Sequence, residues 1–344
     1  PCIESDAREL DFQGRLALPG FVETHIHLDK ACLLGRCNHG AHASLADAIR
    51  SVSEMKRDFT IDDVYARGKK VLERAITQGT MYMRTHVEID PRIGLRSFEA
   101  IRQLKRDYAW AIDLSICAFP QEGLTNDPGT DELLVQALEQ GADALGGCPY
   151  TDTHPERQIE RLFDLARRFD VDLDFHLDFD LVTDWSHLGE VCRQTERHGY
   201  QGRVAIGHVT KLSAMPPALL ASATKRLADS GVALTVLPAT DTYLMGRDAT
   251  HNAPRGLTKA HRLSQAGVRC SIATNNVLNP FTPFGDCSLL RMANFYANIA
   301  HAGVSDFETC LDLITSSAAS LMNIPEYGFV VGNPANLILV DAEN

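Results

Sequence analysis

The sequence predicts a (β/α)₈ barrel, an α/β fold in which eight parallel strands alternate with helices around a closed sheet. Short apolar runs, often bounded by Gly, Pro or Asp, alternate with amphipathic stretches along the 344 residues. This alternation occurs eight times, which is the number of strands that closes such a barrel. Polar residues also follow the ends of several strands, where barrel enzymes carry their chemistry. No GxGxxG motif follows the first strand, which disfavours an open doubly wound sheet.

The expected strands are short and apolar, as buried parallel strands are. They cover residues 21–27, 80–87, 112–119, 142–148, 171–178, 203–209, 232–237 and 268–274. Helical patterns lie between or after them, for example at residues 44–56, 61–78, 157–169, 217–230 and 309–322. Pro217 suits a first helical position, and Gly231 suits the left-handed position that ends a helix. The barrel is therefore expected over residues 19–326.

The two ends of the chain predict a small accessory β-sheet. Residues 1–18 have room for one or two strands, and residues 327–344 combine Gly-rich turns with the strand-like segment NLILVD. We expect these two segments to pair beside the barrel and to form a second, small unit.

Composition narrows the functional classes. The formal net charge is −12, so the protein is not suited to neutralise phosphates, and we expect no nucleic-acid partner. No apolar run spans a bilayer, so we expect no membrane partner either. Nine cysteines without a CxxC pair indicate reduced thiols in a cytoplasmic protein. We further expect a homo-oligomer.

Histidines at the expected strand ends carry the functional prediction. His25 and His27 alternate on one strand, so their imidazoles share a face and could bind one divalent metal ion. His176 ends another strand and adds a third imidazole, which leaves an open position for water. His208 ends the next strand and suits a proton donor or acceptor, or an additional ligand. Each single histidine could instead be a hydrogen-bonded rim residue, but four at one barrel mouth favour a site.

Several motifs extend this pattern along nearly the whole barrel. They are LALPGFVETHIHLDK, MRTHVEID, DLSICAFPQEG, DFHLD, VAIGHVT, NPFTPFGD and YGFVVGNPANLILVDAEN. With them the chain resembles the amidohydrolase superfamily from about residue 16 onwards. More narrowly, it resembles the branch that contains cytosine deaminase and N-isopropylammelide hydrolase. Members of that superfamily carry more chain on both sides of the barrel, so we expect a truncated accessory sheet here.

The resemblance implies roles for individual residues. His25, His27 and His176 would hold one divalent metal ion, zinc in preference to iron. His208 would assist catalysis by polarising the substrate or the bound water. Gln121 in FPQEG and Lys30 in HLDK would contact the substrate, together with Phe281 in NPFTPFGD. The strand expected at 142–148 ends without a lysine that could bridge a second metal, so a mononuclear site is expected.

Two departures from the family pattern bear on the mechanism. The resemblance implies an Asp after the eighth strand that binds the metal and takes a proton from water. The matching residue here is Asn275, which can coordinate through its oxygen but is uncharged and is not a general base. Asn276 similarly replaces a second acidic residue and is expected to contact the substrate.

The second departure follows His176. Cytosine deaminases carry a Glu three positions later, where this chain has Phe179. The nearest carboxylate is Asp178, which strand alternation places on the same face as His176. Asp178 could therefore be a catalytic acid or base, or it could only orient a ligand histidine.

The sequence therefore favours a metal-dependent hydrolase that cleaves a C–N bond of a small nitrogen heterocycle by deamination or by opening a cyclic amide. Two alternatives remain open. Asn275 and Phe179 suit a degenerate barrel that binds a ligand without hydrolysis. A non-hydrolytic isomerase or lyase would need an acid/base pair, for which Asp178 and His208 are the candidates.

Overall fold

The computed structural model describes residues 10–37 and 44–341. Within this part of the chain, eight strands form one parallel sheet in sequence order. They are β2 (Phe21–Ile26), β3 (Thr80–Glu88), β4 (Asp113–Phe119), β5 (Ala144–Gly147), β6 (Asp172–Leu177), β7 (Val204–His208), β8 (Ala233–Val236) and β9 (Cys270–Ile272). A parallel bridge between Ile26 and Asn275 joins the first strand to the chain after the last. This closure confirms the predicted (β/α)₈ barrel.

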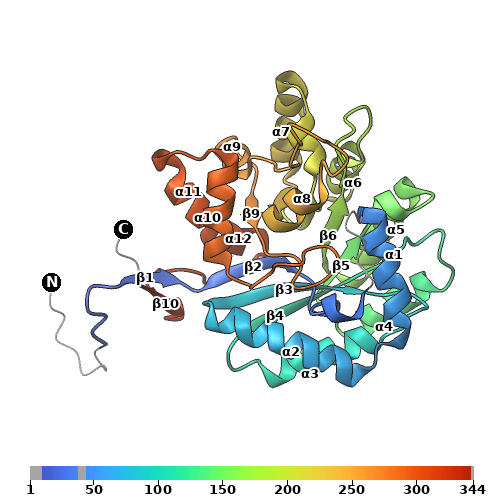
Figure 1. Cartoon of the computed structure of the whole chain (residues 1–344), viewed down its shortest axis with the longest axis horizontal. Helices are drawn as coiled ribbons and strands as arrows, with labels where there is room; N and C mark the ends of the chain where they lie inside the picture. Colours follow the sequence, from blue (N-terminus) through green and yellow to red (C-terminus); the bar gives the residue numbers. More distant parts are fainter. Residues whose placement is uncertain (1–9, 38–43, 342–344) are drawn as a thin grey trace.

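Helices cover the outside of the strands (Figure 1). They are α1 (Leu45–Met55), α2 (Ile61–Thr77), α3 (Arg96–Asp107), α4 (Thr130–Glu139), α5 (Pro155–Phe169), α6 (Leu188–His198), α7 (Pro217–Ser230), α8 (Pro238–Leu244), α9 (Ala260–Gln265), α10 (Leu289–Ala300), α11 (Phe307–Asp312) and α12 (Ser316–Leu321). Their starts follow local chemistry: Ser44 and Thr60 accept the backbone N–H groups of Asp47 and Asp63. None of the described helices has the length and apolar composition needed to cross a bilayer.

The described elements lie close to the expected ones. Every barrel strand begins and ends within two residues of its expected bounds, and α7 has the expected bounds. The helix expected at 309–322 is instead two short helices, α11 and α12. The break has a clear cause: the carbonyls of Leu313 and Ile314 accept the N–H groups of Ile272 and Val22. The helix is interrupted there because these carbonyls accept hydrogen bonds from the barrel strands.

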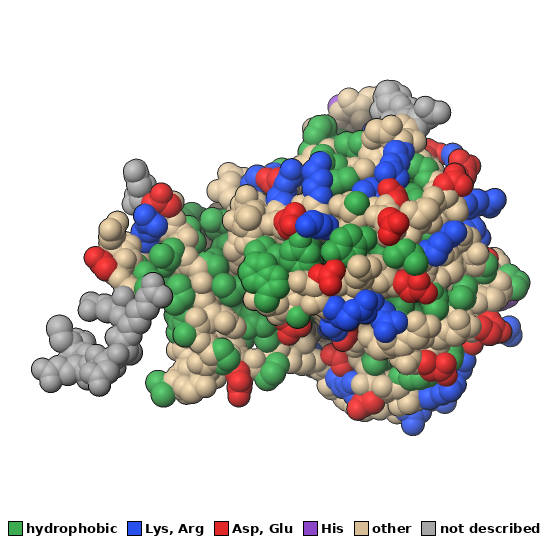
Figure 2. Space-filling model, turned by 90° about the horizontal axis from the view of Figure 1, so that it is seen from below, with side chains coloured by type: hydrophobic (Ala, Val, Ile, Leu, Met, Phe, Trp, Pro, Cys, Tyr) green, Lys and Arg blue, Asp and Glu red, His purple; other side chains and the backbone are tan. Residues whose placement is uncertain are grey.

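In the described part of the chain, the accessory sheet is one pair of strands beside the barrel (Figure 1). Strand β1 (Leu16–Pro19) runs antiparallel to β10 (Leu337–Val340), with Leu16 opposite Val340. Phe329 is 59% exposed and Val331 fully exposed in the segment that leads to β10. On the face seen in Figure 2, acidic and basic side chains intermingle over the barrel. The two expected terminal segments thus do pair, while the exact unit boundaries stay a prediction.

Candidate active site

Three of the predicted histidines meet at the carboxyl end of the barrel. His25 lies in β2, His27 directly follows that strand, and His176 lies near the end of β6. The Nε2 atom of His176 is 3.0 Å from Nε2 of His25 and 3.1 Å from Nε2 of His27. All three side chains are buried. Three imidazole nitrogens from the ends of β2 and β6 thus converge.

The chemistry of these rings fits a divalent metal ion. Burial lowers the pKa of all three imidazoles well below its usual value, and the neighbouring histidine rings lower it further. The charge of Lys30 adds to this effect at His27 and His176. The rings are therefore neutral, as metal ligands must be. Tetrahedral zinc with bonds of about 2.0–2.1 Å would hold its nitrogen ligands about 3.3 Å apart, close to the two contacts seen here. The buried Nδ1 atoms of the three rings have no hydrogen-bond partner.

His208 joins this cluster from the end of β7. Ring nitrogens of His25, His176 and His208 all lie within 4.8 Å of one another. His208 Nδ1 is 2.7 Å from Oδ1 of Asp241, a buried carboxylate on α8. Phe179 stacks on the His208 ring, with centroids 3.8 Å apart. His208 is therefore oriented by an acid on one side and by an aromatic face on the other.

Asp178, expected on the same strand face as His176, is hydrogen-bonded to residues that follow β6. One of its carboxylate oxygens accepts a hydrogen bond from Ser186 Oγ and the other from the backbone N–H of His187. Burial raises the pKa of Asp178, but the side chains of His187 and Ser186, the His187 backbone and the charge of Lys211 together outweigh burial and hold this pKa below its usual value. The physical reason is the backbone: Asp178 has a φ of 47°, in the left-handed region, so strand alternation ends there.

Left-handed backbone recurs at this end of the barrel. His208, Val209 and Asn275 have φ values of 68°, 44° and 62°, although none is a glycine. This conformation costs free energy in such residues, most of all in β-branched Val209. Residues of this kind cluster at functional sites, where the surrounding structure holds them in place.

Asn275 lies between the first and last strands of the barrel. Its backbone N–H donates to the carbonyl of His25, and its carbonyl accepts the N–H of His27. The side chain is fully buried, and neither its Oδ1 nor its Nδ2 has a hydrogen-bond partner. A buried amide without hydrogen-bond partners costs free energy. The side chain of Asn275 is therefore available to bind a ligand.

A second polar layer lies against the histidines. The His86 ring stacks on His25, with centroids 3.8 Å apart, and its Nε2 is 3.5 Å from Oδ1 of Asp174. Arg84 Nη1 donates to the other oxygen of Asp174. Glu23 accepts hydrogen bonds from the backbone and hydroxyl of Thr274, and burial raises its pKa to about 7. These groups fix the orientation of β2 against its neighbours.

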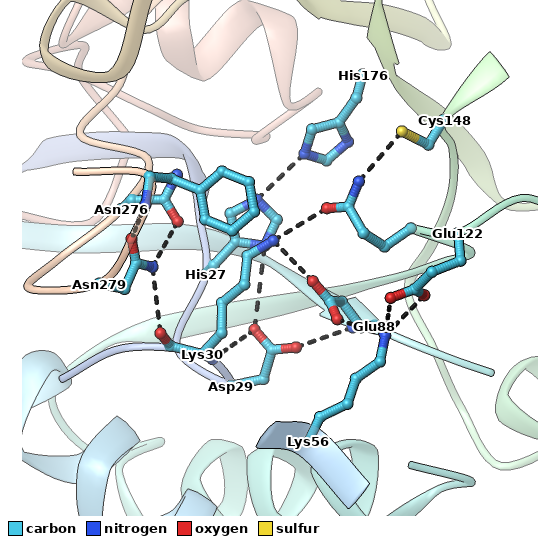
Figure 3. A network of polar contacts seen from close by, with 12 residues as sticks. His27, Asp29, Lys30, Lys56, Glu88, Glu122, Cys148, His176, Asn276 and Asn279 are labelled. Carbon is cyan, nitrogen blue, oxygen red and sulfur yellow. Dashed lines mark hydrogen bonds and ion pairs between the residues drawn. The ribbon is translucent and has the colours of Figure 1, made fainter. Parts of the chain in front are cut away.

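Lys30 lies close to His27 and His176 (Figure 3). Lys30 is buried, and its Nζ donates to Oε1 of Glu88 at 2.8 Å and to Oε1 of Gln121 at 3.1 Å. The same ammonium lies 4.5 Å from the centre of the Phe281 ring. Gln121 in turn donates to Sγ of Cys148. The ammonium is thus held by one acid and one amide.

A neighbouring acidic cluster already contacts a second lysine. Oxygens of Glu88, Asp90 and Glu122 lie close enough together to hold a metal ion. However, Lys56 Nζ lies 2.8, 2.5 and 2.6 Å from these three carboxylates. An ammonium therefore takes the place that a cation would need. Glu88 bridges Lys56, the residue after α1, and Lys30 (Figure 3).

The space between these side chains is small. The remaining cavity is about 10 Å³, which admits about one water molecule. Its walls include His27, Lys30, Gln121, His176, His208, Asn276 and Phe281, all expected from sequence, and also Leu45, Tyr150, Phe179 and Thr240. A heterocycle can therefore enter only when lining side chains move. Leu45 begins α1, which covers this part of the mouth.

Sequence reasoning missed Asp241, the partner of His208. Its signal was present, because Asp241 follows the seventh barrel strand by five residues in LPATD. It also missed Lys56, whose contacts depend on how α1 folds back over the barrel. Nothing in the local pattern of residues 51–60 distinguishes Lys56 from an ordinary surface lysine.

Comparisons with known proteins agree with this geometry. Residues 70–344 match the model of an amidohydrolase family. The pterin deaminase of Rhizobium rhizogenes is 27% identical, with 98% of this chain and 78% of that protein aligned. The N-isopropylammelide isopropyl amidohydrolase of a Pseudomonas species is 26% identical over 97% of this chain and 82% of its own length.

A solved structure is also similar. The 5-methylcytosine deaminase from Klebsiella pneumoniae, liganded with 5-fluorocytosine, superimposes with a TM-score of 0.94 and is 31% identical. The match covers 100% of this chain and 84% of that protein.

Proposed function

The chain belongs to the amidohydrolase family, and we propose that it hydrolyses a C–N bond of a small nitrogen heterocycle with one divalent metal ion, zinc in preference to iron. The observation that carries this proposal is the meeting of His25, His27 and His176 through their Nε2 atoms, with His208 beside them. Relatives that deaminate pterin and 5-methylcytosine or hydrolyse N-isopropylammelide support a flat, nitrogen-rich substrate.

The three ligand histidines and the amide oxygen of Asn275 would hold the metal. When bound, such an ion acts as a Lewis acid and makes water a nucleophile near neutral pH. In the reaction, the water oxygen bonds to the ring carbon and the C–N bond breaks, so that ammonia or an amine leaves. The leaving nitrogen must gain a proton. His208 is placed to carry it, because Asp241 fixes the Nδ1 proton and leaves Nε2 towards the site.

Lys30 and Gln121 define the opposite side of the proposed substrate site. Gln121 can accept and donate hydrogen bonds, whereas the Lys30 ammonium only donates. A substrate with a ring carbonyl next to a ring N–H would satisfy both residues. Phe281 and Phe179 supply aromatic faces beside them, on which a flat ring can stack.

The test is a screen of purified protein, loaded with zinc or with iron, against pterins, 5-methylcytosine, cytosine and N-alkylated triazines. Released ammonia or amine and metal content per chain are the two measurements. We expect about one metal ion per chain and turnover of at least one substrate. His25→Ala and His176→Ala should lose the metal. Metal content that is unchanged in both variants would contradict the proposed ligand set.

A second reading has one specific observation in its favour. Asn275 supplies no charge and no general base, which suits a barrel that binds a heterocycle without hydrolysis. This reading predicts that the protein binds a heterocycle tightly and that no compound in the screen yields a hydrolysis product. For the isomerase or lyase alternative, which needs Asp178 with His208, the hydrogen bonds from Ser186 and His187 to Asp178 are an argument against a free acid or base there.

The cellular setting is also part of the proposal. All eight described cysteines are free thiols, and six of them are buried. Free thiols support a reducing cytoplasm. The expected homo-oligomer stays a prediction, which light scattering would test.

A further inference from the structure

A second and much larger cavity lies next to the catalytic pocket. Its volume is about 770 Å³, and its walls come from α8, residues 246–255, residues 282–284 and α10. Three aromatic side chains line it: Tyr243, Phe284 and Phe295. Phe284 is 78% exposed, which is unusual for a large aromatic side chain. The cavity is therefore open to solvent and offers flat apolar walls.

The charge of this cavity has one sign. Arg247, Arg255 and Arg291 line it, and none of the described lining residues is Asp or Glu. Arg291 is held by a bidentate contact with Asp286. Arg247 lies over the Tyr243 ring, and Arg255 donates to the carbonyl of Thr242. The described walls of this cavity thus carry basic side chains and no acidic one, although the chain has a net charge of −12. Such a lining favours anions.

Guanidinium groups specify the kind of anion. Their planar, fixed donors match the oxygens of a carboxylate or a phosphate, and they bind these groups in pairs of hydrogen bonds. The aromatic side chains add stacking surface for a flat ring. On the barrel face seen in Figure 2, by contrast, basic side chains stand among acidic ones.

One short helix separates this cavity from the catalytic pocket. Thr242 and Tyr243 of α8 line the cavity, whereas Thr240 of the same helix lines the catalytic pocket. The hydroxyls of Thr240 and of the cavity residue Thr282 are hydrogen-bonded. Asp241, between these positions, holds His208. A molecule in the cavity would therefore contact the helix that positions the proposed proton carrier.

We propose that this cavity binds a small aromatic or heteroaromatic molecule that carries a carboxylate or a phosphate. Such a group can come from two sources. It can be the charged tail of a substrate whose ring enters the catalytic pocket, or a separate effector molecule. Both sources share the same chemistry, and the binding itself does not depend on the proposed hydrolysis.

Binding is tested with benzoate and its uncharged counterpart benzamide, which have the same shape. Calorimetry or NMR titration would measure both on the whole protein, on Arg247→Gln/Arg255→Gln and on Arg193→Gln/Arg197→Gln. The last variant loses the same charge from exposed positions on α6. We expect benzoate to bind at least tenfold more tightly than benzamide to the wild type and to the α6 variant. The cavity variant should lose this difference.

Two results would overturn the proposal: equal affinity of the wild type for benzoate and benzamide, or a preference that survives in the cavity variant. The second result would place the anion elsewhere, for example at Lys30. Because no turnover is measured, a failure here is distinct from a failure of the proposed hydrolysis.

The two sources are separated by kinetics once a substrate is known. For a substrate tail, KM for a carboxylate-bearing form of the heterocycle should rise at least tenfold in the cavity variant, while the uncharged form is unaffected. For an effector, added benzoate should change turnover of the uncharged substrate in the wild type but not in the cavity variant. If neither occurs, the coupling of this cavity to the catalytic pocket is wrong.

Discussion

Asp241 Oδ1 lies 2.7 Å from His208 Nδ1, and both side chains are buried. The carboxylate accepts the Nδ1 proton, which fixes the ring tautomer and leaves Nε2 for the site. The other oxygen of Asp241 accepts the N–H of Leu237, so α8 holds the acid firmly. Burial raises the pKa of Asp241 above its usual value, although the contact with His208 opposes this shift.

Asp241→Asn tests this relationship. The amide can still accept the Nδ1 proton, but it cannot stabilise a protonated His208 ring by charge. We expect kcat to fall roughly 10- to 100-fold, with metal content unchanged. Steady-state kinetics and metal analysis measure the two quantities. Asp229→Asn, on the exposed surface of α7, is the matched control. An unchanged kcat would show that the acid only supports the fold.

His208→Ala separates proton transfer from metal binding. If His208 carries the proton to the leaving nitrogen, kcat should fall by roughly a hundredfold or more, while the metal stays bound. His208 also lies within ligand distance of the cluster formed with His25 and His176. Metal analysis therefore decides the role: a variant that loses its metal together with its activity would make His208 a ligand.

The acid stability of the protein should depend on Glu88. Burial raises the pKa of this carboxyl, but Lys30 and Lys56 outweigh burial and lower the pKa to about 2. A carboxylate with a depressed pKa contributes stability that is complete above the unfolded value and is lost as the pH falls towards the folded value. For Glu88 this loss begins near pH 4.5 and amounts to at most about 3 kcal/mol.

Thermal unfolding between pH 5 and pH 3 measures this contribution. The Tm of the wild type should fall more steeply with acidification than the Tm of Glu88→Gln, which has no proton to gain there. Glu122 has a pKa raised to about 7, so its contribution has the opposite sign and lies at higher pH. Parallel Tm curves for the two proteins would rule out this role of Glu88.

The sequence predicted the barrel well because its signals are local. Each strand is an apolar run between breaking residues, and alternation within β2 brings His25 and His27 to one side. What depended on backbone turns was harder to predict. Asp178 was expected beside His176, but a left-handed φ turns it towards Ser186. The residue pattern does not predict a left-handed φ angle at an Asp.

Contacts between residues distant in the sequence could not be predicted either. Lys56 lies 32 positions from Glu88, and only the fold of α1 over the barrel brings them together. The helix break between α11 and α12 likewise depends on carbonyls that serve distant strands. The substrate itself is not readable from the pattern, because the walls of the pocket come from many separate loops.

Asn275 is the residue whose exchange is most informative. Its buried amide has no hydrogen-bond partner, and its backbone is hydrogen-bonded to the backbones of both His25 and His27. Asn275→Asp changes the charge at this position with almost no change in size. If Asn275 is a degenerate Asp, the new carboxylate should tighten metal binding and raise hydrolytic activity, since it adds an anionic ligand and a base.

The opposite outcome has an equally clear meaning. Glu23 is buried close by, hydrogen-bonded to Thr274, the residue next to Asn275. Two carboxylates in one buried region raise the pKa of one of them and disturb the protonation of the site. If the native site is built around the neutral amide and His208, Asn275→Asp should bind metal more tightly but turn over its own substrate more slowly. Metal dissociation constants and kcat/KM of both proteins distinguish these cases. Equal metal affinity together with equal kcat/KM would place the side chain of residue 275 outside the working site.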